Sequence, residues 1–121
     1  MNRPGDRLRR VAEQLRREMA VLLREEVKDP RVRMVTLSGV EVSRDLGHAK
    51  VYVSVLGDRE AVAAALEGLT RAEGFLRREL GRRMSIRTIP HLHFLHDTSM
   101  EQGARINELL EQAKKQRPSE E

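Results

Sequence analysis

The sequence predicts a single α+β domain in which a three-stranded sheet packs on helices, in the order helix, strand, strand, helix, helix, strand, with a C-terminal helix. Apolar residues recur every three or four positions in four stretches, which is the helical period. In three other stretches they alternate, as in a half-buried strand. The 121 residues suffice for one hydrophobic core, and no repeat or linker divides them.

Composition excludes several classes of protein. Charged residues make up 35% of the chain and hydrophobic residues 39%, which is typical of a soluble globular domain rather than a disordered chain. No apolar run approaches the ~20 residues of a membrane span, and none follows the N-terminus, so we expect neither an anchor nor a signal peptide. The absence of cysteine excludes disulfides and thiolate metal sites and fits a reducing cytoplasm.

The charge of the chain predicts a polyanionic partner. The net charge is +4, and most of the basic residues are arginine, whose forked guanidinium matches phosphate geometry. Nucleic acid is therefore the favoured class of partner. Tyr52, Phe75 and Phe94 are the only residues of the Phe, Tyr and Trp types, which weighs against RNA binding by stacking on a sheet of aromatic rings.

Residues 6–27 are expected to form a long amphipathic helix with Asp6 as its N-cap. The helix should end before Pro30, because the residue preceding a proline avoids the α region. Three arginines stack on the face opposite the apolar stripe, namely Arg10, Arg17 and Arg24. A solvated face with ion pairs is the simpler interpretation of these arginines, and a secondary RNA contact is the alternative.

Two strands follow, at residues 32–42 and 48–56, joined by a short polar loop that ends in Gly47. In the first strand the apolar positions change face at Ser38-Gly39, which predicts a β-bulge. The second strand alternates cleanly between apolar and polar residues, so one of its faces should pack and the other should be more polar.

A pair of helices with almost no linker is expected next, capped at its start by Asp58. The break between them should fall at Ala72-Glu73-Gly74, where small residues allow close approach and glycine can adopt dihedral angles that other residues avoid. Beyond the second helix, residues 86–95 read as a third strand with its firm part at 91–95, because Pro90 interrupts the first half.

The last helix is expected from a capping box of Ser99 and Gln102 to about Lys115, and its apolar face consists of Ile106, Leu109, Leu110 and Ala113. The domain would then cover residues 1–116, and residues 117–121 would form a flexible polar tail. The sequence leaves open whether the last helix packs on the core.

Arginine is concentrated around the expected break. Residues 70–87 contain six arginines against two glutamates, a local charge of +4. Arg78 and Arg82 share a helix face while Leu76 and Leu80 point inward, and the first turn after a break offers free N–H groups to an anion. A solvated face is the alternative to the RNA-binding site that we predict from Arg71, Arg77, Arg78, Arg82, Arg83 and Arg87.

Neither a metal site nor a catalytic site is predicted. His91 and His93 share a strand face, but His96 has the other parity and His48 is distant in the sequence, which makes a poor zinc site, so we expect no metal or other cofactor. Asp97 beside His96 can be written as an acid–base pair, yet adjacent residues rarely reach one proton. No nucleophile elbow, P-loop or dinucleotide fingerprint is present. We predict that the protein is not an enzyme.

The order of elements resembles a KH domain of the bacterial type (type II), in which a helix pair carries the nucleic-acid cleft. The GxxG loop between those helices is replaced here by Ala72-Glu73-Gly74, an Ala-x-Gly kink. With this replacement, nearly the whole chain resembles the ribosome-binding factor A family. The motifs that carry the resemblance are Arg7-Leu8-Arg9-Arg10-Val11-Ala12, Leu23 through Asp29-Pro30-Arg31, Gly74-Phe75-Leu76-Arg77-Arg78-Glu79-Leu80, Arg87-Thr88-Ile89-Pro90-His91-Leu92-His93-Phe94 and Asp97-Thr98-Ser99-Met100.

The resemblance implies a cytoplasmic assembly factor that binds 16S rRNA and the free small (30S) ribosomal subunit. It implies assistance in late maturation and in 5′-end processing of precursor 16S rRNA, departure from the finished subunit, and a link to cold adaptation. The residues alone leave two alternatives open, a KH-like module for other RNA or DNA and an adaptor whose basic face docks an acidic protein. We expect a monomer without a membrane partner.

Overall fold

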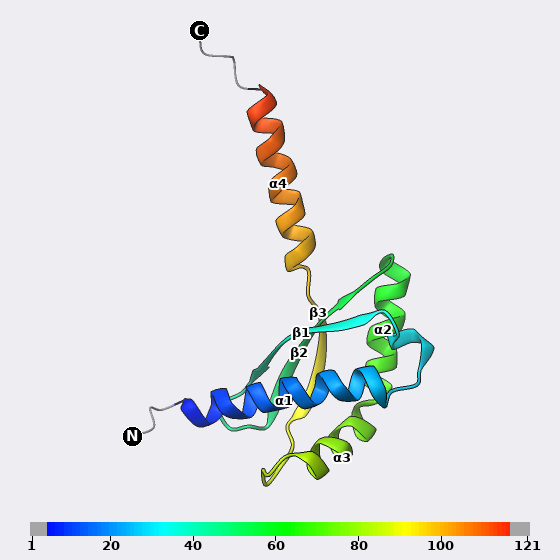
Figure 1. Cartoon of the computed structure of the whole chain (residues 1–121), viewed down its shortest axis with the longest axis vertical. Helices are drawn as coiled ribbons and strands as arrows, with labels where there is room; N and C mark the ends of the chain where they lie inside the picture. The colour runs from blue at the N-terminus through cyan, green and yellow to red at the C-terminus, as the bar shows by residue number, and fades with distance from the viewer. Residues whose placement is uncertain (1–4, 117–121) are drawn as a thin grey trace.

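The computed structural model describes residues 5–116, except for the side chains of residues 100, 101, 103, 104, 115 and 116. Three helices cover one face of a three-stranded sheet, and a fourth extends away from this body (Figure 1). The elements in chain order are α1 (Asp6–Glu25), a 3-10 helix η1 (Pro30–Val32), β1 (Val35–Val42), β2 (His48–Val55), α2 (Arg59–Arg71), α3 (Glu73–Arg83), β3 (His91–His96) and α4 (Ser99–Gln116). The predicted α+β class and element order are confirmed, and the predicted tail at 117–121 lies outside the described residues.

The sheet has the order β1-β2-β3, with β1 and β2 antiparallel and β2 and β3 parallel. A parallel pair needs a long crossover connection, which α2 and α3 supply. Ala49, Val51 and Val53 are fully buried on the helix side, as the alternation in β2 predicts. The alternate residues of β2 therefore belong to the open face of the sheet.

The strand boundaries differ from the prediction at the starts of β1 and β3, and by one residue at the ends of β2 and β3. β1 begins at Val35 rather than residue 32, because Pro30–Val32 forms the 3-10 helix η1, capped by Asp29 through the N–H of Arg31 at 2.9 Å. The predicted bulge is confirmed by a register shift between Leu37 and Gly39. β3 begins at His91, which confirms the firm part of its prediction, and the preceding residues are not in a strand.

Two of the three predicted helix caps are wrong by one position. Gly5, with φ of 97°, is the N-cap of α1, and Asp6 is the first helical residue. Ser99 is likewise the first residue of α4, and its N–H donates to Oδ1 of Asp97 at 2.9 Å. Asp58 caps α2 as predicted, because its Oδ1 accepts the N–H of Ala61 at 2.9 Å.

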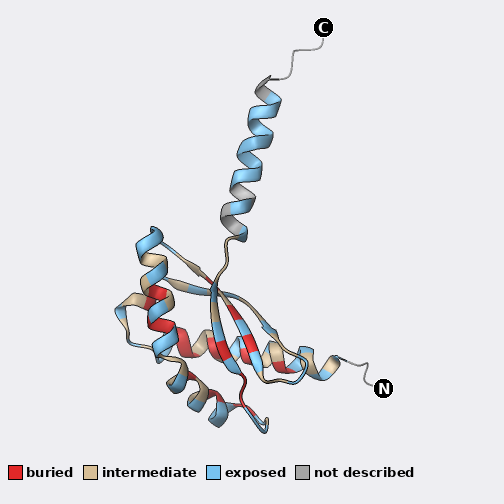
Figure 2. Ribbon diagram, turned by 180° about the vertical axis from the view of Figure 1, so that it is seen from behind, coloured by how far each residue is buried: buried red, intermediate tan, exposed pale blue. Residues whose placement is uncertain are grey.

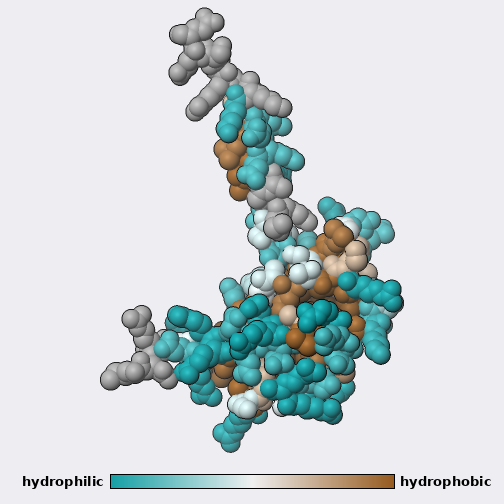
Figure 3. Space-filling view, viewed as in Figure 1, coloured by the Kyte–Doolittle hydropathy of each residue, from teal (hydrophilic) through white to brown (hydrophobic). Residues whose placement is uncertain are grey.

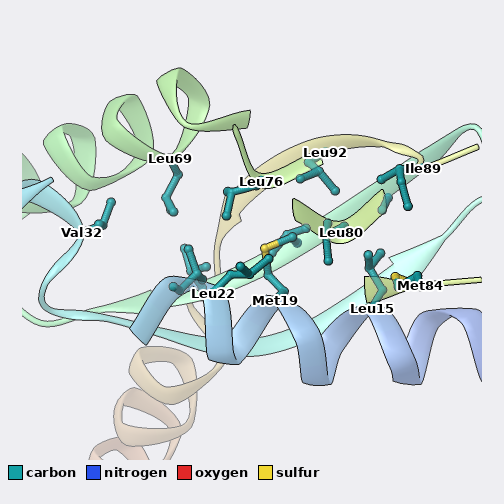
Figure 4. Packing of buried hydrophobic residues seen from close by; sticks show 14 of the residues in the cluster. Leu15, Met19, Leu22, Val32, Leu69, Leu76, Leu80, Met84, Ile89 and Leu92 are labelled. Carbon is teal, nitrogen blue, oxygen red and sulfur yellow. The ribbon is translucent and has the colours of Figure 1, made fainter. Parts of the chain in front are cut away.

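The hydrophobic core lies between the sheet and helices α1, α2 and α3 (Figure 2). Leu15, Met19 and Leu22 of α1 face Leu76 and Leu80 of α3 in this layer (Figure 4). Each fully buried side chain of this kind contributes about 1.5–3 kcal/mol. Burial of its inner face therefore fixes α3, and with it the direction of the arginines on its outer face.

Helix α4 does not pack on this core. Its predicted apolar stripe is exposed, with 56% of Ile106 and 57% of Leu109 accessible to solvent. The helix projects beyond the sheet, and its apolar side chains form a separate strip in the space-filling view (Figures 1 and 3). None of the helices within the described residues is long and apolar enough to cross a membrane.

Acid is expected to destabilise the connection between α1 and β1. Hydrogen bonds from the Arg31 side chain and then from its backbone N–H lower the pKa of Asp29 from 3.8 to about 2. A carboxyl group whose pKa falls on folding stabilises the protein above its ordinary pKa, and this contribution is lost as the pH drops through the folded value. Tm should therefore fall between about pH 4 and pH 2, and less steeply in Asp29→Asn. Thermal melts followed by circular dichroism across this pH range test the expectation. An equal dependence of Tm on pH in the parent protein and in Asp29→Asn would contradict it.

Candidate nucleic-acid interface

A single residue, Ala72, joins α2 to α3. Its backbone is right-handed, with φ of −82° and ψ of −4°. The N–H of Ala72 donates to the carbonyl oxygen of Gly68 at 3.0 Å, and its own carbonyl accepts the N–H of Leu76 at 2.9 Å. Ala72 therefore ends one helix and begins the next, and its half-buried side chain packs against the core.

Gly74 lies inside α3 and not at the break. Within the described chain, positive φ angles occur at Gly5, Leu46 and Gly57, so Gly74 uses no conformation reserved for glycine. A Cβ added there would meet only Nη1 of Arg78, at 3.9 Å. The expectation that Gly74 adopts dihedral angles closed to other residues is wrong, because the helix restarts at Glu73.

Gly74→Ala is expected to stabilise the protein by about 0.5 kcal/mol, since the position is helical and exposed and alanine loses less backbone entropy. Urea unfolding of the variant and the parent protein measures the difference. A loss of more than about 1 kcal/mol would show that this joint needs glycine after all.

The face of α3 next to β3 holds that strand in place. Arg77 donates from Nη2 to the carbonyl oxygen of Ile89 at 2.8 Å and from Nε to that of Pro90 at 3.2 Å. One turn earlier, Oε2 of Glu73 accepts the N–H of Leu92 at 2.6 Å. The predicted RNA-binding residue Arg77 therefore already has a structural contact.

The opposite border of α3 faces α1. Arg83 has a side chain that is only 33% exposed, with Nη1 at 3.8 Å from Oε2 of Glu18 and Nη2 at 4.0 Å from Oε1 of Glu26. This arginine links the end of α3 to α1. Arg77 and Arg83 thus point to the two sides of α3, although both belong to the predicted arginine group.

Arg78 and Arg82 lie on the outer face of α3, opposite the buried leucines. Arg78 is exposed and has neither an ion pair nor a hydrogen bond to any described residue. The Arg82 side chain is 78% exposed, and its Nη1 lies 3.4 Å from Oε2 of Glu79. The Glu79 side chain is only 19% exposed, but the guanidinium is open to solvent, so Arg82 can turn from this carboxylate to a phosphate.

The remaining predicted arginines are also exposed. Arg71 ends α2, with Nη2 at 3.0 Å from Oε1 of Glu67, and Arg87 lies in the loop that leads to β3. The secondary candidates follow the solvent side of α1, where Figure 3 shows a hydrophilic surface, and they are Arg10, Arg17 and Arg24. The structure therefore gives the arginine group an exposed outer pair, Arg78 and Arg82, flanked by residues that hold the helices together.

A histidine cluster escaped the sequence prediction. His48 is distant from the other histidines in the sequence, but the parallel pairing of β2 and β3 places it opposite His91. Nδ1 of His48 lies 2.9 Å from Nε2 of His93. The sequence does show that His48 lies on the polar face of its strand and that His91 and His93 share one face of theirs. This pattern indicates a cluster only once the pairing of the two strands is known.

Comparison with known proteins identifies the family. The family model for ribosome-binding factor A matches residues 7–110. Ribosome-binding factor A of Thioalkalivibrio sulfidiphilus is 59% identical over 113 residues, covering 93% of this chain and 88% of that protein. The corresponding protein of Azoarcus is 52% identical over 113 residues, covering 93% of this chain and 90% of that protein.

Solved structures agree with the family model. The crystal structure of ribosome-binding factor A from Thermus thermophilus superposes with a TM-score of 0.67 at 34% identity, covering 74% of this chain and 93% of that one. A homology model of the Thermus thermophilus protein, fitted into a cryo-EM map of a 30S–RbfA complex, gives a TM-score of 0.62 at 34% identity with the same coverage. The chain belongs to the ribosome-binding factor A family.

Proposed function

We propose that this protein is a non-enzymatic assembly factor that binds the small (30S) ribosomal subunit and its 16S rRNA, and that it assists late maturation and 5′-end processing of precursor 16S rRNA. Membership of the family and the similarity to the Thermus thermophilus protein fitted into a map of a 30S–RbfA complex support this function. The main structural support is the pair of exposed arginines Arg78 and Arg82 on the outer face of α3, whose inner face is buried in the core.

The fold that we propose for this function is a type II KH-like domain with Ala72-Glu73-Gly74 in place of the GxxG loop. The helix pair between two parallel strands is consistent with it. Because Ala72 packs against the core, its role is to set the angle between α2 and α3 rather than to touch RNA. That angle determines where the outer arginines point.

The RNA-binding surface has residues of two kinds. Arg71, Arg78, Arg82 and Arg87 are exposed, and those with partners have weak ones, so they neutralise phosphates directly. Arg77 and Arg83 act mainly by holding α3 against β3 and α1, although a guanidinium has five donors and some remain for RNA. A secondary contact would come from the α1 arginines Arg10, Arg17 and Arg24.

In this mechanism the protein binds RNA and performs no chemistry on it. Arginines on α3 neutralise rRNA phosphates, and binding stabilises one fold of the maturing RNA or blocks its premature use. We further propose that it acts as a monomer in the cytoplasm, on free small subunits, and that the requirement for it is greatest in the cold. These statements rest on the family rather than on a contact within the fold.

Sucrose-gradient sedimentation with purified ribosomal subunits tests the proposal. The protein should travel with free small subunits at low salt and dissociate progressively as salt rises, because phosphate contacts release counterions. Binding that does not change with salt would contradict phosphate contacts. An association that survives nuclease treatment would favour the alternative function, an adaptor whose basic face docks an acidic protein. In cells, cross-linking to many unrelated transcripts rather than to one rRNA would favour a general RNA-binding module.

A further inference from the structure

Three histidines gather on the open face of the sheet, opposite the face that carries helices α1 to α3. His48 begins β2, and His91 and His93 lie on β3, with His48 and His91 paired in the register. The ring centroids of His48 and His93 are 5.1 Å apart, and those of His48 and His91 are 5.8 Å apart. All three residues are exposed, so dissolved ions have access to them.

Two of these imidazoles direct ring nitrogens at each other. Nδ1 of His48 and Nε2 of His93 are 2.9 Å apart. At this distance one nitrogen must carry a proton and the other must accept it, because two N–H groups or two lone pairs would repel. The two ring nitrogens therefore share a single proton position between β2 and β3.

We propose that Nδ1 of His48 and Nε2 of His93 bind one divalent transition-metal ion in place of the shared proton. Zinc binds imidazole nitrogen at about 2.0–2.1 Å with tetrahedral geometry, which places two bound nitrogens about 3.3 Å apart. The observed 2.9 Å must then widen by about 0.4 Å. Small rotations of two exposed side chains supply that change without moving the strands.

The donor atoms determine the class of ion. Imidazole suits Zn²⁺, Ni²⁺ and Cu²⁺, whereas Mg²⁺ prefers oxygen ligands. No group of three or more His, Cys, Asp or Glu side chains within the described residues is arranged to hold a metal ion. Water must therefore complete the coordination, and the site is weaker than a closed structural zinc site.

Neighbouring charges on the sheet partly offset each other. Lys50 is the register partner of His93, and its ammonium group disfavours a bound cation. Glu41 is in turn the partner of Lys50 on β1, and its carboxylate reduces that repulsion. The bound ion would link the beginning of β2 to the beginning of β3, and it would stabilise the folded state relative to the unfolded state. This inference does not rest on the proposed RNA-binding function, because α3 lies on the other face of the sheet.

Isothermal titration of the untagged full chain tests the site, since a polyhistidine tag would bind the same ions. ZnCl₂ and NiCl₂ should bind saturably at one site, and MgCl₂ should not. His48→Ala and His93→Ala should each lower the zinc affinity at least about tenfold, because each removes one of two protein ligands. The matched control is His96→Ala, on the same strand but outside the cluster, and it should leave the affinity unchanged.

Thermal unfolding supplies an independent readout. Added zinc should raise Tm of the parent protein and of His96→Ala, but not of His48→Ala. His48→Gln, which keeps a side chain of similar size, repeats the comparison if alanine disturbs the sheet. Absence of saturable zinc binding, equal affinity in His48→Ala and the parent, or an equal loss in His96→Ala would overturn the proposal.

Discussion

Reversing both outer charges of α3, in Arg78→Glu with Arg82→Glu, is expected to abolish co-sedimentation with small ribosomal subunits while the fold survives. A hydrogen bond to a charged group contributes about 1.5–3 kcal/mol, so losing two phosphate contacts should weaken binding by at least about a hundredfold. The fold should persist because Arg78 has no partner among the described residues and Arg82 loses a single ion pair, in which its own side chain is 78% exposed.

The matched control is Arg59→Glu with Arg105→Glu. Both residues are exposed, one at the start of α2 and the other in α4, and the change in net charge is the same. Binding should fall only slightly in the control, through the long-range field. Equal losses in the two double variants would show that overall charge matters rather than the α3 surface, and unchanged binding in Arg78→Glu with Arg82→Glu would exclude this surface.

Leaving Arg77 and Arg83 out of this test keeps its result interpretable. A glutamate at residue 77 would face the carbonyl oxygens of Ile89 and Pro90, and one at residue 83 would face Glu18 and Glu26. Either change removes a tertiary contact. Each also places a carboxylate against other oxygen atoms, which are carbonyl oxygens at residue 77 and carboxylates at residue 83, and these repel it. Loss of binding in a variant of all four arginines would therefore not separate RNA contact from misfolding.

Local patterns were enough to predict the helices, the core and the bulge. The spacing of Leu76 and Leu80 identifies the buried side of α3, and Arg78 and Arg82 fall on the opposite side by helical geometry alone. The change of parity at Ser38-Gly39 likewise predicts the bulge directly. Side chains alternate between the two faces of a strand, so the apolar residues can change face only where an extra residue is inserted. These features depend only on residues that are close together in the sequence.

Features that depend on distant partners could not be predicted in this way. Arg77 and Arg83 lie at the borders of the buried stripe of α3, where the neighbouring element decides their role. The approach of His48 to His93 requires the parallel pairing of β2 with β3, which no short pattern specifies. The wrong caps at Asp6 and Ser99 have another cause, since a one-residue shift leaves the sequence pattern almost unchanged.

Replacing Arg77 by methionine is expected to destabilise the protein by about 2–3 kcal/mol, because carbonyl groups that lose a hydrogen-bond partner cost about 1–3 kcal/mol each. Pro90 is fully buried and Ile89 is 9% exposed, so water replaces the guanidinium poorly. Methionine retains much of the apolar stem, which limits the change to the lost donors. Urea unfolding measures the effect, and Arg78→Met, on the exposed side of the same helix, should change stability by less than about 0.5 kcal/mol.

Subunit binding by the same two variants separates structure from recognition. At a temperature where both are folded, Arg77→Met should bind within a few-fold of the parent protein, because Arg78 and Arg82 are still presented. Arg78→Met should lose about tenfold, the effect of one charged contact. If Arg77→Met instead kept full stability and lost binding, its contacts with Ile89 and Pro90 would be dispensable, and Arg77 would touch RNA directly, as its place in the arginine group first suggested.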